Sequence, residues 1–174
     1  MTWLRSLAGR LTLTLLALLA LAGTAFIGLN VVATHLYLQE VNQKLNRDLA
    51  SHIAGSDLFM RDGEVNREAL KGLFDALMTV NPSIEVYLTD NRGRLLAYSA
   101  PPGKVVRERI DLDPVRRFLA GDTAFPLYGD DPRSSGRRKV FSAAPVLDEG
   151  ERAGYLYVVL GGELFDSVVQ RVEG

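Results

Sequence analysis

An uncharged stretch near the N-terminus constrains this chain more than any other feature of its sequence. No Asp, Glu, Lys or Arg occurs between Arg10 and Glu40, and residues 11–33 (LTLTLLALLALAGTAFIGLNVVA) are polar only at three Thr and one Asn. As an α-helix these 23 residues would be about 34 Å long, enough to cross a hydrocarbon core of about 30 Å. Thr hydroxyls are tolerated in lipid because they can bond to carbonyls one turn earlier. The sequence therefore predicts a transmembrane helix over residues 11–33.

The start of this stretch fits both an uncleaved anchor and a signal peptide. Ala20-Leu21-Ala22 resembles a cleavage site, with the cut after Ala22, but the apolar run continues to residue 33, which favours the anchor. Arg5 and Arg10 precede the span, so the positive-inside rule places residues 1–10 in the cytoplasm. Both interpretations export the rest of the chain, and the expected location is the inner (cytoplasmic) membrane with residues 34–174 periplasmic or extracellular.

Residues 34–55 are expected to continue as a helix out of the membrane and to end at Gly55. An apolar stripe follows one face of this helix at Leu38, Val41, Leu45, Leu49 and Ile53. Such a stripe can pack on its own domain, on a second subunit, or on both. Within the span, Ala20, Thr24 and Gly28 recur every four residues, a spacing that lets two helices approach closely, although chance in an Ala/Gly-rich segment is the alternative. A homodimer through residues 11–55 is the expectation.

Beyond residue 60 the sequence predicts an α+β domain. After a polar turn at residues 60–64, residues 66–80 carry apolar side chains at helical spacing and end before Pro82. The period then changes to two, which predicts a half-buried hairpin of residues 84–89 and 94–99 around a turn. The later elements expected are a short helix over 113–121 capped by Asp113 and closed by Gly121, a loop over 122–136, strands over 139–146 and 154–160, and a helix starting at residue 163.

Three segments of this domain carry a family resemblance: IEVYLTDNRGRLLAYS (84–99), DPVRRFLAG (113–121) and RRKVFSAAPVLDEGERAGYLYVVLGGE (137–163). They resemble the extracytoplasmic PAS-like sensor domains, of the PDC or single-Cache type, in bacterial membrane sensor histidine kinases. The resemblance implies a PAS-like antiparallel sheet over residues 34–162. It also implies that residues 163–174 begin an exit helix toward a second membrane span, which leads to a HAMP linker, a dimerising histidine domain and an ATPase domain.

The sequence lacks the motifs of a catalytic chain. Cys is absent, and neither His35 nor His52 lies in the H-E-x-x-[TN]-P context of a phosphoacceptor. No D-x-G-x-G lid, G-x-S-x-G elbow, H-E-x-x-H helix or G-x-x-x-x-G-K-[ST] loop occurs. With 20 basic and 21 acidic residues, the chain also lacks the basic excess of a nucleic-acid binder. We therefore expect no enzyme activity in this chain, no cofactor and no nucleic-acid partner.

The resemblance implies a ligand pocket between the sheet and the helix–loop layer that covers it. In relatives that sense dicarboxylates or citrate, basic and hydroxyl side chains hold the carboxylates, which suits Arg because it can grip both oxygens. The matching candidates here are Arg138, Lys139, Ser142, Tyr98, Arg107 and Arg109. No metal site is expected, but a weaker alternative is a divalent cation held by the carboxylates of Asp130, Asp131, Asp148, Glu149 and Glu151.

The expected function is the sensing module of a two-component sensor histidine kinase, which passes a signal across the membrane by a helix shift. The signal would be a small organic ligand or a periplasmic protein. Two alternatives remain: the sensor of a chemoreceptor or cyclic-dinucleotide enzyme, and a self-contained, membrane-tethered periplasmic binding protein.

Overall fold

The computed structural model describes residues 7–55, 59–61, 64–80, 84–100, 103–121 and 124–161. The chain divides into two compact units, residues 1–38 and residues 39–174. The first unit contains most of helix α1 (Leu7–Leu45), which is long and apolar enough to cross a membrane. The Thr12, Thr14 and Thr24 hydroxyls each donate to a carbonyl three or four residues earlier, at 2.8–2.9 Å. The prediction that residues 11–33 are helical is therefore confirmed.

The expectation of one helix over residues 34–55 is wrong, because α1 ends at Leu45 and a separate helix, α2 (Leu49–Ala54), follows a three-residue turn. In the turn, the Asn46 side chain donates to the Asn42 carbonyl at 2.8 Å, the kind of local bond that competes with regular helix. The break also divides the expected stripe. Ile53 is buried, whereas Leu38 and Leu45 remain 54% and 81% exposed.

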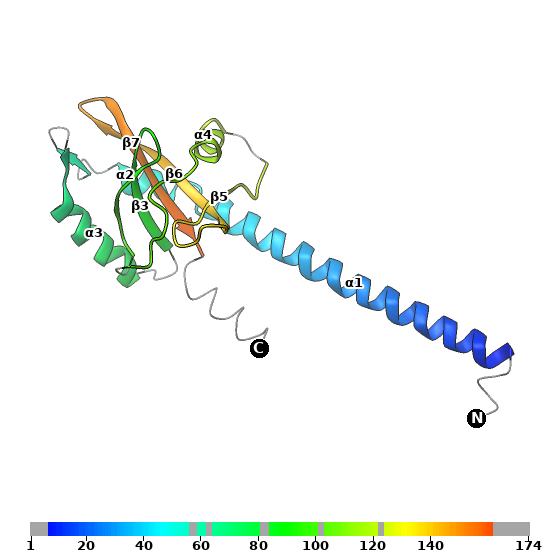
Figure 1. Cartoon of the computed structure of the whole chain (residues 1–174). Coiled ribbons are helices and arrows are strands. Elements are labelled where there is room, and N and C mark those ends of the chain that lie inside the picture. Colours follow the sequence, from blue (N-terminus) through cyan, green and yellow to red (C-terminus); the bar gives the residue numbers. More distant parts are fainter. Residues whose placement is uncertain are drawn as a thin grey trace. The chain divides into compact units, whose positions relative to one another are not determined.

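The second unit is built on a five-stranded antiparallel sheet in the order β4-β3-β7-β6-β5 (Figure 1). Its strands are β3 (Ile84–Asp90), β4 (Leu95–Tyr98), β5 (Tyr128–Asp130), β6 (Arg138–Asp148) and β7 (Glu151–Leu160). The four strands expected from the sequence are present. Strand β5 was not expected, because residues 122–136 contain the Gly, Pro, Asp and Ser typical of a loop. Strands β1 (Met60–Arg61) and β2 (Glu64–Val65) form a separate ribbon where a polar turn was expected.

Both faces of the sheet are covered by apolar layers. Helices α2 and α3 (Arg67–Val80) pack on one face, which we call the α2/α3 face. Helix α4 (Asp113–Leu119) and the segments around residues 105–112 and 125–127 pack on the other, the α4 face; Figure 1 shows α3 and α4 on opposite sides. Side chains of alternate residues reach each face, so Val140 lies on the α2/α3 face and Phe141 on the α4 face.

Two expectations are wrong. Because both faces of the sheet are covered, strand β3 is not half-buried but buried along Ile84–Thr89, and its polar residues Glu85 and Thr89 lie in the interior. Helix α4 does not use Asp113 as its cap; Leu112 occupies that position, and the Asp111 side chain accepts the Asp113 N–H at 2.9 Å. The helix expected from residue 163 lies outside the described residues.

Candidate functional site

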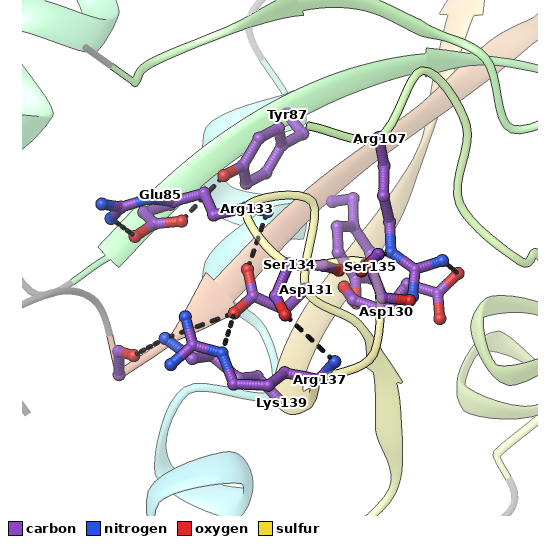
Figure 2. A network of polar contacts seen from close by, with 12 residues as sticks. Glu85, Tyr87, Arg107, Asp130, Asp131, Arg133, Ser134, Ser135, Arg137 and Lys139 are labelled. Carbon is purple, nitrogen blue, oxygen red and sulfur yellow. Dashed lines mark hydrogen bonds and ion pairs between the residues drawn. The ribbon is translucent and has the colours of Figure 1, made fainter. Parts of the chain in front are cut away.

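A group of charged side chains lies on the α4 face where β3 and β7 meet the segment between β5 and β6 (Figure 2). At its inner end, Arg133 donates to Oε1 of Glu85 at 2.6 Å, and the Tyr87 hydroxyl donates to Oε2 at 2.7 Å. Glu85 and Tyr87 are two residues apart on β3 and therefore share the α4 face. The ion pair is largely buried, with side-chain exposures of 12% for Arg133 and 6% for Glu85. Both carboxylate oxygens of Glu85 are thus bonded in the interior.

Asp131 is the centre of the segment that joins β5 to β6. Its backbone N–H donates to the Arg137 carbonyl at 3.1 Å, and its Oδ1 accepts the Arg133 N–H at 2.9 Å, which folds residues 131–137 into a compact turn. Its Oδ2 is buried and has no hydrogen-bond partner among the described residues. Two cations lie at ion-pair distance instead, Arg137 Nε at 3.5 Å and Lys139 Nζ at 3.8 Å.

The outer end of the group is a second ion pair, between Arg107 and Asp130 at 3.2 Å. Arg107 also donates from Nε to the Ser134 carbonyl at 2.7 Å, and the Tyr157 hydroxyl donates to the Asp130 carbonyl at 2.8 Å. These bonds attach the segment before α4 to the β5–β6 connection and to β7. We call the whole set the charged cluster; it comprises Glu85, Tyr87, Arg107, Asp130, Asp131, Arg133, Arg137, Lys139 and Tyr157.

Burial sets the protonation of the two tyrosines. It raises the pKa of the Tyr157 hydroxyl well above its usual value, and the nearby Asp130 carboxylate raises it further. Burial is likewise the largest cause of the raised pKa of Tyr87, followed by the Glu85 carboxylate. Both hydroxyls therefore stay neutral hydrogen-bond donors over the whole physiological pH range.

The charged cluster carries a small excess of positive charge. Its four cationic groups outnumber its three carboxylates, and Arg137, whose side chain is half exposed, is the cation most open to solvent. A guanidinium beside an ammonium suits a carboxylate or phosphate group. Among the described residues there is no group of three or more His, Cys, Asp or Glu side chains that could hold a metal ion.

The structure brings two of the six sequence-based ligand candidates into this cluster, Arg107 and Lys139. Ser142 is buried on the opposite face of β6, where it bonds to the turn between α1 and α2. Arg138, Tyr98 and Arg109 are exposed, and Arg109 forms an isolated bridge with Arg94. The ligand candidates thus do not form one site.

The five acidic candidates are divided between two places. Asp130 and Asp131 belong to the charged cluster, next to cations. Asp148, Glu149 and Glu151 lie at the β6–β7 turn, at the far end of an 11-residue strand that is about 33 Å long at the usual rise per residue. Each carboxylate in the cluster already neutralises an arginine or lysine.

Gln43 was missed as a buried contact, and five members of the charged cluster were missed as site residues: Glu85, Tyr87, Arg133, Arg137 and Tyr157. Glu85 gave no local signal, because a charged residue between Ile84 and Val86 is also what a half-buried strand contains. Gln43 gave none either, since it lies among the polar residues of a helix face that the sequence predicts to be solvated.

No protein-family model and no curated protein matches the chain. Among solved structures, one neighbour is the sensor domain of CusS, crystallised with silver bound. It shares 18% sequence identity, the match covers 78% of this chain and 97% of that chain, and the TM-score is 0.39. A likeness of this degree identifies neither a family nor a ligand for this chain.

Proposed function

We propose that this chain is the extracytoplasmic sensing module of a membrane-anchored two-component sensor histidine kinase. The observation that carries the proposal is the continuity of α1, which runs unbroken from the exposed apolar residues of the first unit to Gln43 in the core of the second. One continuous helix therefore connects a membrane-length segment to an α+β domain. Such a helix can pass a displacement along its axis, as a transmembrane sensor requires.

The α+β domain supports the same function. Its antiparallel sheet contains the strands that the PAS-like resemblance implies, and it presents a charged cluster beneath a covering segment. We propose that the cluster recognises a small organic anion through Arg137 and Lys139, whose cationic groups lie 3.5 Å and 3.8 Å from the same oxygen of Asp131, Oδ2. Ligand binding would act only through a difference in affinity between two arrangements of the domain.

The topology can be tested with reporter fusions. Alkaline phosphatase fused after residue 161 should be active, because it folds only outside the cytoplasm, and a green fluorescent protein at the same position should be dark. A fluorescent and phosphatase-inactive pair would contradict the proposed export. Extraction of the unfused chain with alkaline carbonate separates the retained anchor, which stays in the pellet, from a chain cleaved after Ala22.

The output is tested by the gene beyond codon 174. A second apolar span followed by a HAMP linker and an H-E-x-x-[TN]-P histidine would support the sensor kinase. A different signalling domain would support the chemoreceptor or cyclic-dinucleotide alternative, and a stop codon would support the tethered binding protein.

Ligand recognition is tested by thermal unfolding of the full chain in detergent micelles with organic acids, amino acids and divalent cations. A melting temperature raised by an organic acid, with the increase lost in Arg137→Ala, would support the proposal. An increase that is unchanged in Arg137→Ala would place the ligand elsewhere. Arg92→Ala is the matched control, since this exposed arginine lies in the turn between β3 and β4, outside the charged cluster.

A further inference from the structure

The last turns of α1 are held to the sheet by the amide of Gln43. Its Oε1 accepts the Leu127 N–H at 2.7 Å, and its Nε2 donates to the carbonyls of Leu127 and Phe141, both at 2.9 Å. The side chain is completely buried. The amide oxygen and both amide hydrogens are therefore used inside the protein.

This amide takes the place of a backbone pair. Strands β5 and β6 pair in the register Tyr128↔Val140, so Leu127 and Phe141 would be the next pair in the ladder. The Gln43 amide lies between them and bonds to both. A helix side chain thus continues the hydrogen-bonding of the sheet at the point where β5 and β6 separate.

Ser142, the next residue of β6, holds the other side of the helix break. Its hydroxyl donates to the Arg47 carbonyl at 2.7 Å and accepts the Ala50 N–H at 3.1 Å. These two groups lie in the turn after α1 and in α2 respectively. Gln43 and Ser142 therefore hold both sides of the break to consecutive residues of one strand.

The same strand is attached to the charged cluster three residues earlier. Lys139 Nζ lies 3.8 Å from Asp131 Oδ2 and donates at 2.8 Å to the carbonyl of Gly161, directly after β7 (Figure 2). The four residues 139–142 of β6 thus contact the cluster, the end of β7, helix α1 and helix α2.

A buried polar residue at position 43 lowers the stability of the fold unless hydrogen bonds within the protein replace those that it made with water. A buried amide must make all its hydrogen bonds to offset the loss of water, whereas a leucine would fill similar space without that requirement. What the amide adds is a fixed register, because its bonds are satisfied at only one position of the helix along β6. A displacement of β6 must then either move α1 or break the hydrogen bond from Gln43 to the Phe141 carbonyl.

We infer that residues 139–142 of β6 couple the charged cluster to helix α1, with Gln43 and Ser142 as positioning residues. A change of charge or occupancy at Asp131 and Lys139 is passed to α1 through the Gln43 amide and the Ser142 hydroxyl. The coupling is a property of the fold and does not depend on the proposed function. It identifies the N-terminal helix as a route for displacement that is separate from the chain following β7.

The test measures the position of α1 against the sheet by pulsed electron paramagnetic resonance. The chain has no Cys, so Leu45→Cys and Leu147→Cys provide two unique sites for nitroxide labels, and both side chains are exposed. Asp131→Asn is the perturbation, and Lys139→Gln is a second one. In the full-length chain in micelles, each should shift the mean label distance by about 1–2 Å, the scale of helix displacements at packed interfaces.

The same shift is then measured in the Gln43→Leu and Ser142→Ala backgrounds. Both should abolish it, whereas Lys44→Leu, a substitution of an exposed neighbour on α1, should preserve it. Cooperative thermal unfolding of each variant verifies that the sheet is folded, and Gln43→Asn replaces Gln43→Leu if the latter does not fold. A purely structural role changes stability without removing the response to Asp131→Asn.

Two results would overturn the inference. One is the absence of any shift with both Asp131→Asn and Lys139→Gln in the otherwise unmodified chain. The other is a shift that persists at full size when Gln43 or Ser142 has been replaced, because α1 would then be displaced by another route.

Discussion

At the scale of single residues, the ion pair between Arg133 and Glu85 is the contact most sensitive to substitution. Both side chains are largely buried, and the pair joins the β5–β6 connection to β3. Removing one partner of a buried pair leaves an uncompensated charge in the interior. The loss is then far larger than the small contribution of a solvated surface pair.

We predict that Arg133→Met lowers the free energy of unfolding by about 3–5 kcal/mol. Adding Glu85→Gln to Arg133→Met should recover part of this loss, because the second substitution removes the stranded charge. Urea denaturation of the four members of this double-mutant cycle measures both effects. If the changes in unfolding free energy of the two single variants add up to that of the double variant, the two side chains act independently.

The two buried tyrosines make the free energy of unfolding decrease at alkaline pH. In the unfolded chain a tyrosine loses its proton near pH 10, whereas Tyr157 in the folded chain keeps its proton because burial raises its pKa. Above about pH 10 the folded state therefore binds more protons, and stability falls as pH rises; below that pH both states are protonated and this contribution is fully present.

We predict that Tyr157→Phe reduces the slope of unfolding free energy against pH by about 1.4 kcal/mol per pH unit above pH 10. Tyr87→Phe should act in the same direction, since burial also raises the pKa of that hydroxyl. Urea denaturation at pH 8, 10 and 11 supplies the slopes. Identical slopes for Tyr157→Phe and the unmodified chain would contradict this account.

At the residue level, the ligand-binding role of the candidate residues stays a prediction. Lys139 and Arg107 were candidates because the resemblance implies basic side chains around a ligand, and the structure places both in the charged cluster. Gln43 could not be identified, because its partners Leu127 and Phe141 lie 84 and 98 residues away. A glutamine on a helix is normally solvated, and only the tertiary fold makes it an interior residue.

At the scale of elements, the close approach of β3 and β7 depends on Gly154. This residue pairs with Asp90, and a Cβ atom added to it would lie only 1.9 Å from the Thr89 carbonyl oxygen. The two backbones would have to separate to admit any side chain. The glycine thus permits the tight register of the two central strands.

We predict that Gly154→Ala lowers the free energy of unfolding by about 2–4 kcal/mol, because the clash lies between two backbones and no side chain can move to relieve it. Gly72→Ala is the matched control. Gly72 lies on an exposed part of α3 with nothing within 4 Å of an added Cβ, so alanine should stabilise by about 0.5–1 kcal/mol. Denaturant unfolding of the two variants measures the contrast, and a neutral Gly154→Ala would contradict the register described for β3 and β7.

Element boundaries followed from the sequence where a long periodic pattern existed. Helix α3 and strands β3, β6 and β7 lie where the apolar periods predict them. Strand β5 was missed because three residues carry no measurable period and two of them, Gly129 and Asp130, are poor strand formers. The break after Leu45 was missed because the local bond of Asn46 is only part of its cause, and the turn is also held by Ser142, a partner from β6.

At the scale of the whole molecule, α1 carries exposed apolar side chains in both compact units of the chain. Leu38 and Leu45 lie one heptad apart beyond the expected span and remain exposed. Together with the small residues Ala20, Thr24 and Gly28 in the span, they supply a surface suited to a second copy. We propose the homodimer through α1 on this basis.

We predict that the full-length chain carrying Leu38→Cys as its only cysteine forms disulfide-linked dimers in membranes under mild oxidation. Leu45→Cys should behave similarly, because it lies two turns further along the same face. Leu147→Cys is the control, since it is exposed at the far end of β6 and should remain monomeric on a non-reducing gel. Efficient cross-linking at Leu147 alone would place the interface on the sheet.

The general architecture, an apolar span followed by an α+β domain with antiparallel strands, could be predicted from the sequence because it follows from the pattern of apolar residues. The covering of both sheet faces could not be predicted, because strand β3 alternates apolar and polar residues as a half-exposed strand does. Its polar residues are tolerated inside only because Arg133 and Tyr87 bond to Glu85. That arrangement needs residues from distant parts of the chain and has no local signature.

Because the Gln43 amide accepts the Leu127 N–H, hydrogen–deuterium exchange at Leu127 reports on the attachment of α1 to the sheet. The Leu127 amide proton lies outside every strand, yet its acceptor is a buried side chain of α1. Exchange of this proton with deuterium therefore requires α1 to separate locally from the sheet, without global unfolding. The exchange rate at a single loop amide would report how often the helix detaches.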